Sequence, residues 1–236
     1  MSLSPSLYLF PVQLSDVPLQ NVLPAFNMEI ISTVKYFIVE NVRTARRFLK
    51  SCDKSINIDE LTFFVLNQHT LATDIPAMLE PIKLGYSMGI ISEAGCPAIA
   101  DPGADVVAIA QSKGYNVVPL VGPSSILMSL MSSGFNGQSF AFNGYLPIEP
   151  SARNNKLKEM ERRIRRERQS QIFIETPYRN NKLIEELCNI LPGDMLLCVA
   201  SDITGESQSI VTKKISQWKK CEYNYNKIPT IFLLFS

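Results

Sequence analysis

Residues 88–103 decide the fold of this chain, and they read MGIISEAGCPAIADPG. The first four residues form an apolar run with the length of a β-strand, and the segment that starts at Ala104 has helical composition. Between them, two glycines and two prolines fix an exposed backbone, which a ligand can approach closely. Ligands of open α/β sheets bind outside the carboxyl ends of the strands, so the stretch predicts a binding loop. Composition alone leaves an ordinary strand-to-helix connection as the alternative.

The pattern around this stretch alternates short apolar runs with helical segments. Predicted strands lie at residues 7–10, 36–39, 62–66, 88–91 and 116–120, and predicted helices at 77–84 and 104–113. Gly114 follows the second helix, where a C-terminal cap is expected. Strands that alternate with helices indicate a parallel α/β sheet.

The second half of the chain has more closely spaced strands. Helices are predicted at 153–168 and 180–191, and strands at 172–175, 195–200, 209–212 and 228–235. This spacing is typical of a mixed sheet. The turn-rich segment VGPSS at 121–125 separates the halves, so we predict two α/β domains, residues 1–120 and 121–236.

Composition limits the functional classes. The 236 residues are 46% hydrophobic and 19% charged, as in soluble globular proteins, and the net charge of +1 excludes a globally basic nucleic-acid binder. Five cysteines without a Cys-x-x-Cys pair predict neither a disulfide framework nor a metal site. The first ten residues lack the features of a signal peptide, and no apolar run approaches the ~20 residues of a membrane span. These features predict a cytoplasmic protein without a membrane partner.

Two segments offer basic helix faces. Arg43, Arg47 and Lys50 are spaced to share one face of a helix, with Arg46 beside them, and this face can bind phosphates or be merely solvated. The predicted helix 153–168 has a narrow apolar stripe and a polar face with several arginines, which can bind a nucleic-acid backbone, contact a partner or face solvent. Those arginines are Arg162, Arg163, Arg165, Arg166 and Arg168.

Four motifs in order carry a resemblance to a known family. The loop 92–103 and the segment VPLVGPSS at 118–125 resemble the S-adenosylmethionine-binding loops of the tetrapyrrole methylase family. The segments ENVRTARRFL at 40–49 and FIETPYR at 173–179 are similar to counterparts in the bacterial small-subunit rRNA ribose 2′-O-methyltransferases. The similarity extends from about Leu7 to Phe235. No Gly-x-Gly-x-x-Gly or P-loop motif is present to favour a dinucleotide or P-loop protein instead.

The resemblance implies a cytosolic methyltransferase of two α/β domains, commonly a homodimer, which holds S-adenosylmethionine in a cleft between the domains, mostly through backbone groups. The implied cofactor contacts are Pro11, Ala94, Gly95, Cys96, Ile99, Ser124, Ser125, Thr176 and Ile203. No metal is implied. Because the donor carries its own reactive methyl group, positioning is the main catalytic device.

The acceptor side is predicted from charge. A hydroxyl acceptor must lose its proton, and the candidate bases are Glu40, Glu93, Asp101 and Asp202. Glu40 and Arg43 lie in the segment most similar to the rRNA methyltransferases, so we predict that this pair contacts the acceptor. The acceptor is then RNA of the small ribosomal subunit or, as the alternative, an anionic tetrapyrrole that is methylated on carbon.

Three other residues have simpler interpretations. The only histidine, His69, is expected to be a polar neighbour of the cleft rather than a general base. We expect Cys96 to be a small packing residue rather than a nucleophile. Glu175 is spaced to pair with Arg179, four residues further on.

The chain departs from the rRNA methyltransferase pattern at several positions. PVQLSD at 11–16 replaces a segment with a Gly-Asn pair, SDITG at 201–205 replaces a run similar to Arg-Glu-Leu-Thr-Lys, Asn41 replaces an aspartate, and Pro229-Thr230 replaces Gly-Glu. These changes motivate a third hypothesis, a non-catalytic binding protein of the same fold.

Overall fold

The computed structural model describes residues 5–236 and divides into two compact units, which meet at the Ser124–Ser125 peptide bond. The sequence placed this division between residues 120 and 121. A hydrogen bond from Asn27 Nδ2 to the carbonyl of Val121 (2.8 Å) attaches the turn after residue 120 to the first unit. Residues 1–4, which begin the segment tested for a signal peptide, lie outside the described residues. Across residues 5–236, no helix has the length and apolar character needed to cross a membrane.

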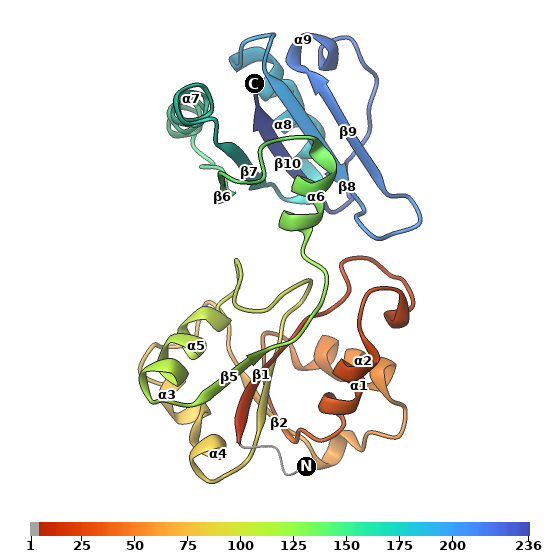
Figure 1. The fold of residues 1–236 in the computed structure, drawn as a ribbon, viewed down its shortest axis with the longest axis vertical. Coiled ribbons are helices and arrows are strands. Elements are labelled where there is room, and N and C mark those ends of the chain that lie inside the picture. The colour runs from red at the N-terminus through yellow and green to blue at the C-terminus, as the bar shows by residue number, and fades with distance from the viewer. Residues whose placement is uncertain (1–4) are drawn as a thin grey trace. The chain divides into compact units, whose positions relative to one another are not determined.

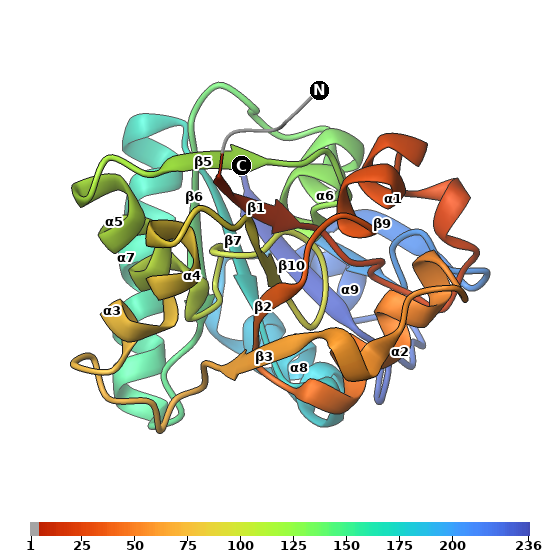
Figure 2. The same cartoon turned by 90° about the horizontal axis from the view of Figure 1, so that it is seen from below.

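The first unit contains a five-stranded sheet. Its strands are β1 (Ser6–Phe10), β2 (Tyr36–Val39), β3 (Thr62–Val65), β4 (Met88–Ile91) and β5 (Asn116–Pro119). The order is β3-β2-β4-β1-β5, and every neighbouring pair is parallel, which confirms the predicted parallel sheet. Figure 2 shows β3 and β5 at opposite edges of this sheet. The carboxyl ends of β4, β1 and β5 therefore lie next to one another.

Helices cover both faces of this sheet (Figure 1). On one face lie α1 (Ala25–Ile31) and α2 (Val42–Cys52); on the other lie α3 (Ile75–Met78), α4 (Glu80–Lys83) and α5 (Gly103–Ser112). Successive strand residues point to opposite faces, so Phe37 joins the α1–α2 core and Ile38 the core on the other face. Short 3-10 turns at Leu19–Asn21 and Ile58–Glu60 complete the unit.

The single helix predicted at 77–84 is wrong, because α3 and α4 are separate four-residue helices. Pro81 lies in the first turn of α4, where its missing N–H costs nothing, but the same residue cannot continue a preceding helix. Helix α1 was not predicted. It begins directly after Pro24 and has only seven residues. Its buried Ile30 and Ile31 are adjacent, so the sequence shows no helical repeat of apolar residues there.

The second unit contains a mixed sheet, as predicted. Its elements are α6 (Ser125–Ser133), β6 (Phe140–Tyr145), α7 (Pro150–Glu167), β7 (Ser170–Ile174), a 3-10 turn (Pro177–Arg179), α8 (Asn180–Ile190), β8 (Leu196–Ser201), β9 (Ser209–Lys214), α9 (Ile215–Trp218) and β10 (Thr230–Phe235). The order is β6-β7-β10-β8-β9; β6 and β7 are parallel and the other pairs antiparallel. The sequence missed β6, which contains Asn143, Gly144 with φ +64° and a break in register before Tyr145.

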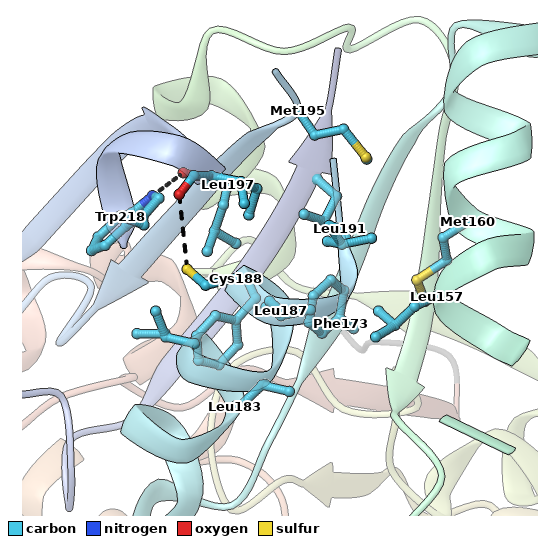
Figure 3. Close-up of a cluster of buried hydrophobic side chains, with 14 of the residues drawn as sticks. Leu157, Met160, Phe173, Leu183, Leu187, Cys188, Leu191, Met195, Leu197 and Trp218 are labelled. Carbon is cyan, nitrogen blue, oxygen red and sulfur yellow. Dashed lines mark hydrogen bonds between the residues drawn. The ribbon is translucent and has the colours of Figure 1, made fainter. Parts of the chain in front are cut away.

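One face of this sheet packs against α7, α8 and α9 (Figure 3). The predicted apolar stripe of α7, formed by Leu157, Met160 and Ile164, is fully buried and lies near Phe173. The indole of Trp218 donates a hydrogen bond to the carbonyl of Leu197 at 2.9 Å. The apolar side of α7 is therefore used entirely by the unit's own core, and its polar side faces outward.

Candidate functional site

Three loops join at the carboxyl ends of β1, β4 and β5. Val12 and Gly95 exchange two backbone hydrogen bonds of 2.9 and 3.0 Å, which connect the loop after β1 to the loop after β4. The thiol of Cys96 lies 3.4 Å from the carbonyl of Pro123, which connects the loop after β4 to the loop after β5. The segments 11–14, 92–103 and 121–124 thus form one surface, which we call the loop edge.

Glycine makes the closest of these approaches possible. A Cβ atom built on Gly122 would lie 2.2 Å from Cβ of Pro11 and 2.5 Å from its Cγ. Both atoms belong to a rigid ring, which cannot move aside as a flexible side chain does. The loops after β1 and β5 can therefore meet only with glycine at this position.

The backbone of the loop 92–103 is strained. Gly95 has φ +69°, and Ala98 and Ala100 have φ +65° and +58°, a region that L-residues with a side chain rarely adopt. Gly95 adopts this conformation without strain, whereas Ala98 and Ala100 each cost about 1–3 kcal/mol, and strained residues of this kind cluster at ligand-binding sites. The carboxylate of Asp101 accepts a hydrogen bond of 2.7 Å from the N–H of Gly103, which fixes the start of α5. The loop is held in one shape by its own contacts.

The structure brings together six of the nine predicted cofactor residues, namely Pro11, Ala94, Gly95, Cys96, Ile99 and Ser124. Ile99 is 54% exposed, which leaves apolar surface for a ligand, and Ala94 is exposed as well. The other three belong to the second unit: Ser125 starts α6, exposed Thr176 follows β7, and buried Ile203 follows β8.

The backbone of Gly95 is bonded within the loop edge. Both its N–H and its C=O bond to Val12, and the hydroxyl of Ser92 also donates to that carbonyl at 2.8 Å. Its backbone polar groups therefore already have partners within the chain. The Cδ2 atom of Leu14 lies 3.1 Å from the Cβ position of Gly95, so Leu14 covers this glycine. These contacts make Gly95 part of the loop edge, and its role as a cofactor contact stays a prediction.

Carboxylates gather beside the loop edge. Glu40, directly after β2, lines an open pocket of about 510 Å³ together with Asn41, Asn67, Gln68, His69, Glu93 and Pro102. Burial raises the pKa of Glu40 above its ordinary value, and repulsion from Glu93 and Asp101 raises it further. The hydroxyl of Thr44 donates a 2.7 Å hydrogen bond to Glu93. This acidic pocket attracts cations, and Glu40 has the raised pKa that suits a general base.

Helix α2 presents the predicted basic face next to this pocket. The side chain of Asn41 caps the helix by accepting a hydrogen bond from the N–H of Arg43 at 2.9 Å. Arg43, Arg47 and Lys50 are exposed, while Arg46 lies over the ring of Phe63 at 5.5 Å. The capping asparagine thus places Arg43 in the first turn of α2, three residues after Glu40. Both Glu40 and Asn41 line the pocket.

The remaining candidates have structural partners. Burial raises the pKa of Cys96, so its thiol stays protonated and serves packing, as expected. Buried Glu175 accepts a hydrogen bond from Arg179 at 2.7 Å, as the spacing predicted. Asp202, a candidate base, lies in the second unit and accepts a bond from the N–H of Ser207 at 2.9 Å. His69 is exposed and lines the pocket. No group of three or more metal-binding side chains is arranged as a metal site within residues 5–236.

Sequence reasoning missed several residues of the site. Val12, Leu14 and Gly122 act through contacts between loops that are far apart in the sequence. Asn67 and Gln68 line the pocket and follow β3 after one intervening residue, Leu66. The sequence offered a signal for them, because they are polar residues near the carboxyl end of a parallel strand.

Solved structures with the same arrangement of elements are methyltransferases. The methyltransferase CobJ matches 98% of this chain and 93% of its own chain, with a TM-score of 0.63 and 13% identity. The cobalt precorrin-4 methyltransferase CbiF covers 98% of this chain with a TM-score of 0.60 and 11% identity. The chain has the tetrapyrrole methylase fold.

Several curated relatives of this chain carry the name ribosomal RNA small subunit methyltransferase I. The protein of Vibrio cholerae is 28% identical over 207 residues, which cover 88% of this chain and 68% of that protein. The protein of Xylella fastidiosa is 31% identical over 175 residues (74% and 61%), and that of Haemophilus influenzae 30% identical over 159 residues (66% and 55%). The matches thus span between about half and two thirds of these relatives' lengths. No family model matches the chain. The resemblance noted in the sequence is confirmed.

Proposed function

We propose that this chain is an S-adenosylmethionine-dependent methyltransferase that methylates RNA of the small ribosomal subunit, as the names of its relatives describe for those proteins. The observation that carries the proposal is the loop edge, in which the strained loop 92–103 lies beside an acidic pocket. Identity supports RNA over a tetrapyrrole acceptor, because the tetrapyrrole enzymes share only 10–13% of residues with this chain.

The acidic pocket fits the proposed donor. S-adenosylmethionine carries a sulfonium and an ammonium group, and when bound it supplies an electrophilic methyl group. Glu40 and Glu93 line a pocket whose volume of about 510 Å³ is in the range of small-molecule sites. A cation in this pocket relieves the repulsion that raises the pKa of Glu40. Exposed Ile99 provides apolar surface that excludes water from the bound molecule.

Two residues would act on the acceptor. The carboxylate of Glu40 accepts the proton of the acceptor hydroxyl, because its raised pKa makes it a better base than an ordinary glutamate. The exposed guanidinium of Arg43 binds a phosphate of the acceptor and so orients the hydroxyl. A cationic face on α2 allows a polyanion to approach despite the acidic pocket. Ser125, Thr176 and Ile203 remain cofactor contacts proposed from the resemblance alone.

Calorimetric titration with S-adenosylmethionine and transfer of labelled methyl to purified small ribosomal subunits test the proposal. Donor binding together with label in RNA is expected. Absence of donor binding at millimolar concentration would overturn the methyltransferase function. Binding with transfer only to a tetrapyrrole would support carbon methylation, for which the solved structures are the precedent. Binding without any transfer would support a non-catalytic relative, which Leu14 above Gly95 motivates.

We also propose that the protein acts in the cytoplasm as a homodimer, as the resemblance implies. Unpaired thiols suit a reducing compartment: all five cysteines are free. Light scattering after size-exclusion chromatography measures the mass in solution, and a monomer would contradict the dimer.

A further inference from the structure

Helix α7 is rich in charged side chains, whereas its packing against the sheet uses only its apolar stripe. Its residues Pro150–Glu167 contain seven lysines and arginines and three glutamates. Its apolar stripe is fully buried in the core of the second unit, so the helix offers no apolar surface to a lipid bilayer. Figure 2 shows the helix along its length. Only the cations of α7 that have no carboxylate partner are fully available to bind an anion.

Ion pairs divide these cations into two groups. Arg163 and Lys156 both bind Glu159, at 2.9 and 3.2 Å, and Arg165 binds Glu161 at 3.0 Å and Asp194 at 3.5 Å. Arg153 binds Glu186 of α8 at 3.0 Å. Four carboxylates therefore balance the charge of these four side chains, which leaves them a weaker attraction for a phosphate than unpaired cations have.

The other group consists of Lys158, Arg162 and Arg166. All three side chains are exposed, and none forms an ion pair within the described part of the chain. They are spaced four residues apart, so they form one stripe along α7 with about 6 Å of rise between neighbours and about 12 Å in total. We call them the unpaired stripe.

We infer that the unpaired stripe binds the phosphate backbone of RNA. The inference rests on the proposed function and deepens it, since it assigns a docking surface in the second unit to the acceptor. Three cations in a row, with no carboxylate bound to them and no apolar residue among them, match a chain of phosphates better than a folded protein surface. Each contact releases a counterion, so binding through the stripe weakens as salt rises.

Two triple variants test the inference. K158Q/R162Q/R166Q removes the unpaired stripe, and K156Q/R163Q/R165Q removes three ion-paired cations from the same helix. Both change the net charge by the same amount, and glutamine preserves helix propensity. Affinity for a labelled single-stranded RNA of mixed sequence is measured from about 50 to 200 mM salt. Thermal unfolding and donor calorimetry establish that each variant is folded and still binds S-adenosylmethionine.

The stripe variant is expected to bind RNA at least about tenfold more weakly, and its log–log salt slope should fall by about 2, at about 0.7 per lost contact to a single strand. The paired variant should retain most of the wild-type slope. Equal losses of RNA affinity in both variants would overturn the inference that the unpaired stripe binds RNA, since the change in net charge alone would explain them. The proposed function would stay intact. Wild-type protein that binds the donor but shows no salt-dependent RNA affinity would overturn both. Selective binding of an acidic protein by the stripe would also overturn it.

Discussion

The acidic pocket of the first unit and helix α7 of the second have opposite charge. The carboxylates of the pocket repel one another, whereas most cations of α7 form ion pairs. Around the pocket, Glu40 lies near two other carboxylates, which together with burial raise its pKa. On α7, ion pairs neutralise most of the charge and leave only the unpaired stripe. A chain with a net charge of +1 thus separates an acidic surface from a basic one. The net charge of the chain therefore reveals neither the acidic pocket nor the unpaired stripe.

The largest effect is expected from Gly122→Ala, which tests whether the loop edge is one rigid surface. The new methyl group would meet the ring of Pro11, so we expect the free energy of unfolding to fall by about 1–3 kcal/mol and donor binding to be lost. Chemical denaturation and calorimetry measure the two effects. Gly137→Ala is the matched control, because a Cβ there meets nothing within 4 Å. Normal donor affinity in the Gly122 variant would show that the junction of the loops does not shape the cofactor site.

Arg43→Ala tests whether the acceptor is bound by α2. The KM for the RNA acceptor should rise up to about fivefold, because one solvent-exposed ion pair with phosphate, of up to about 1 kcal/mol, is lost. Donor affinity should not change. Arg46→Ala serves as control, since Arg46 lies against Phe63 rather than extending freely. An equal rise in KM for both variants would show that α2 contributes only general attraction.

Glu40→Gln tests the attraction of the pocket for a cation. The affinity for S-adenosylmethionine should fall about twofold to fivefold at neutral pH, the size expected for a partly exposed charge pair. In the wild type, affinity should decrease as the pH falls through the raised pKa of Glu40, because protonation removes the same charge. Titration of both proteins over a pH series measures this, and an unchanged pH profile in the variant would exclude Glu40 as its cause.

The smallest effect is on stability. Because the pKa of Glu40 is raised in the folded chain, the folded state binds its proton more tightly than the unfolded state does. The ionised group therefore destabilises the fold above the folded pKa and has no effect well below the ordinary glutamate pKa of 4.5. Glu40→Gln should be more stable than wild type at neutral pH, by less than about 1 kcal/mol after solvent screening. The gain should vanish in acid; a gain that persists there would have another origin.

The sequence predicted the elements whose signal is local. Continuous apolar runs such as Tyr36–Val39 and Met88–Ile91 matched β2 and β4, because strands buried on both faces are apolar throughout. The apolar stripe of α7 was equally local. Strand β6 was missed because Asn143 and Gly144 interrupt its pattern, and α1 because it is short.

For the site, the sequence predicted the loops but not how they contact one another. The resemblance placed six cofactor residues in segments that the parallel sheet does bring together. It could not show that Gly95 bonds to Val12, since that contact depends on the register between β1 and β4. Likewise, the number of arginines in α7 did not show which of its cations are paired. Pairing depends in part on carboxylates outside the helix, such as Asp194 and Glu186.

Strand β10 occupies the centre of its sheet, between β7 and β8, although it comes after the other four strands of that sheet along the chain. Until the ribosome has released it, β7 and β8 have no partner on their facing sides, and the apolar side chains of α7 and α8 have an incomplete surface to cover. The first unit has every strand of its sheet by Pro119 and can fold during translation. The second must wait, so a nascent chain stalled before Thr230 would be a target for chaperones and proteases.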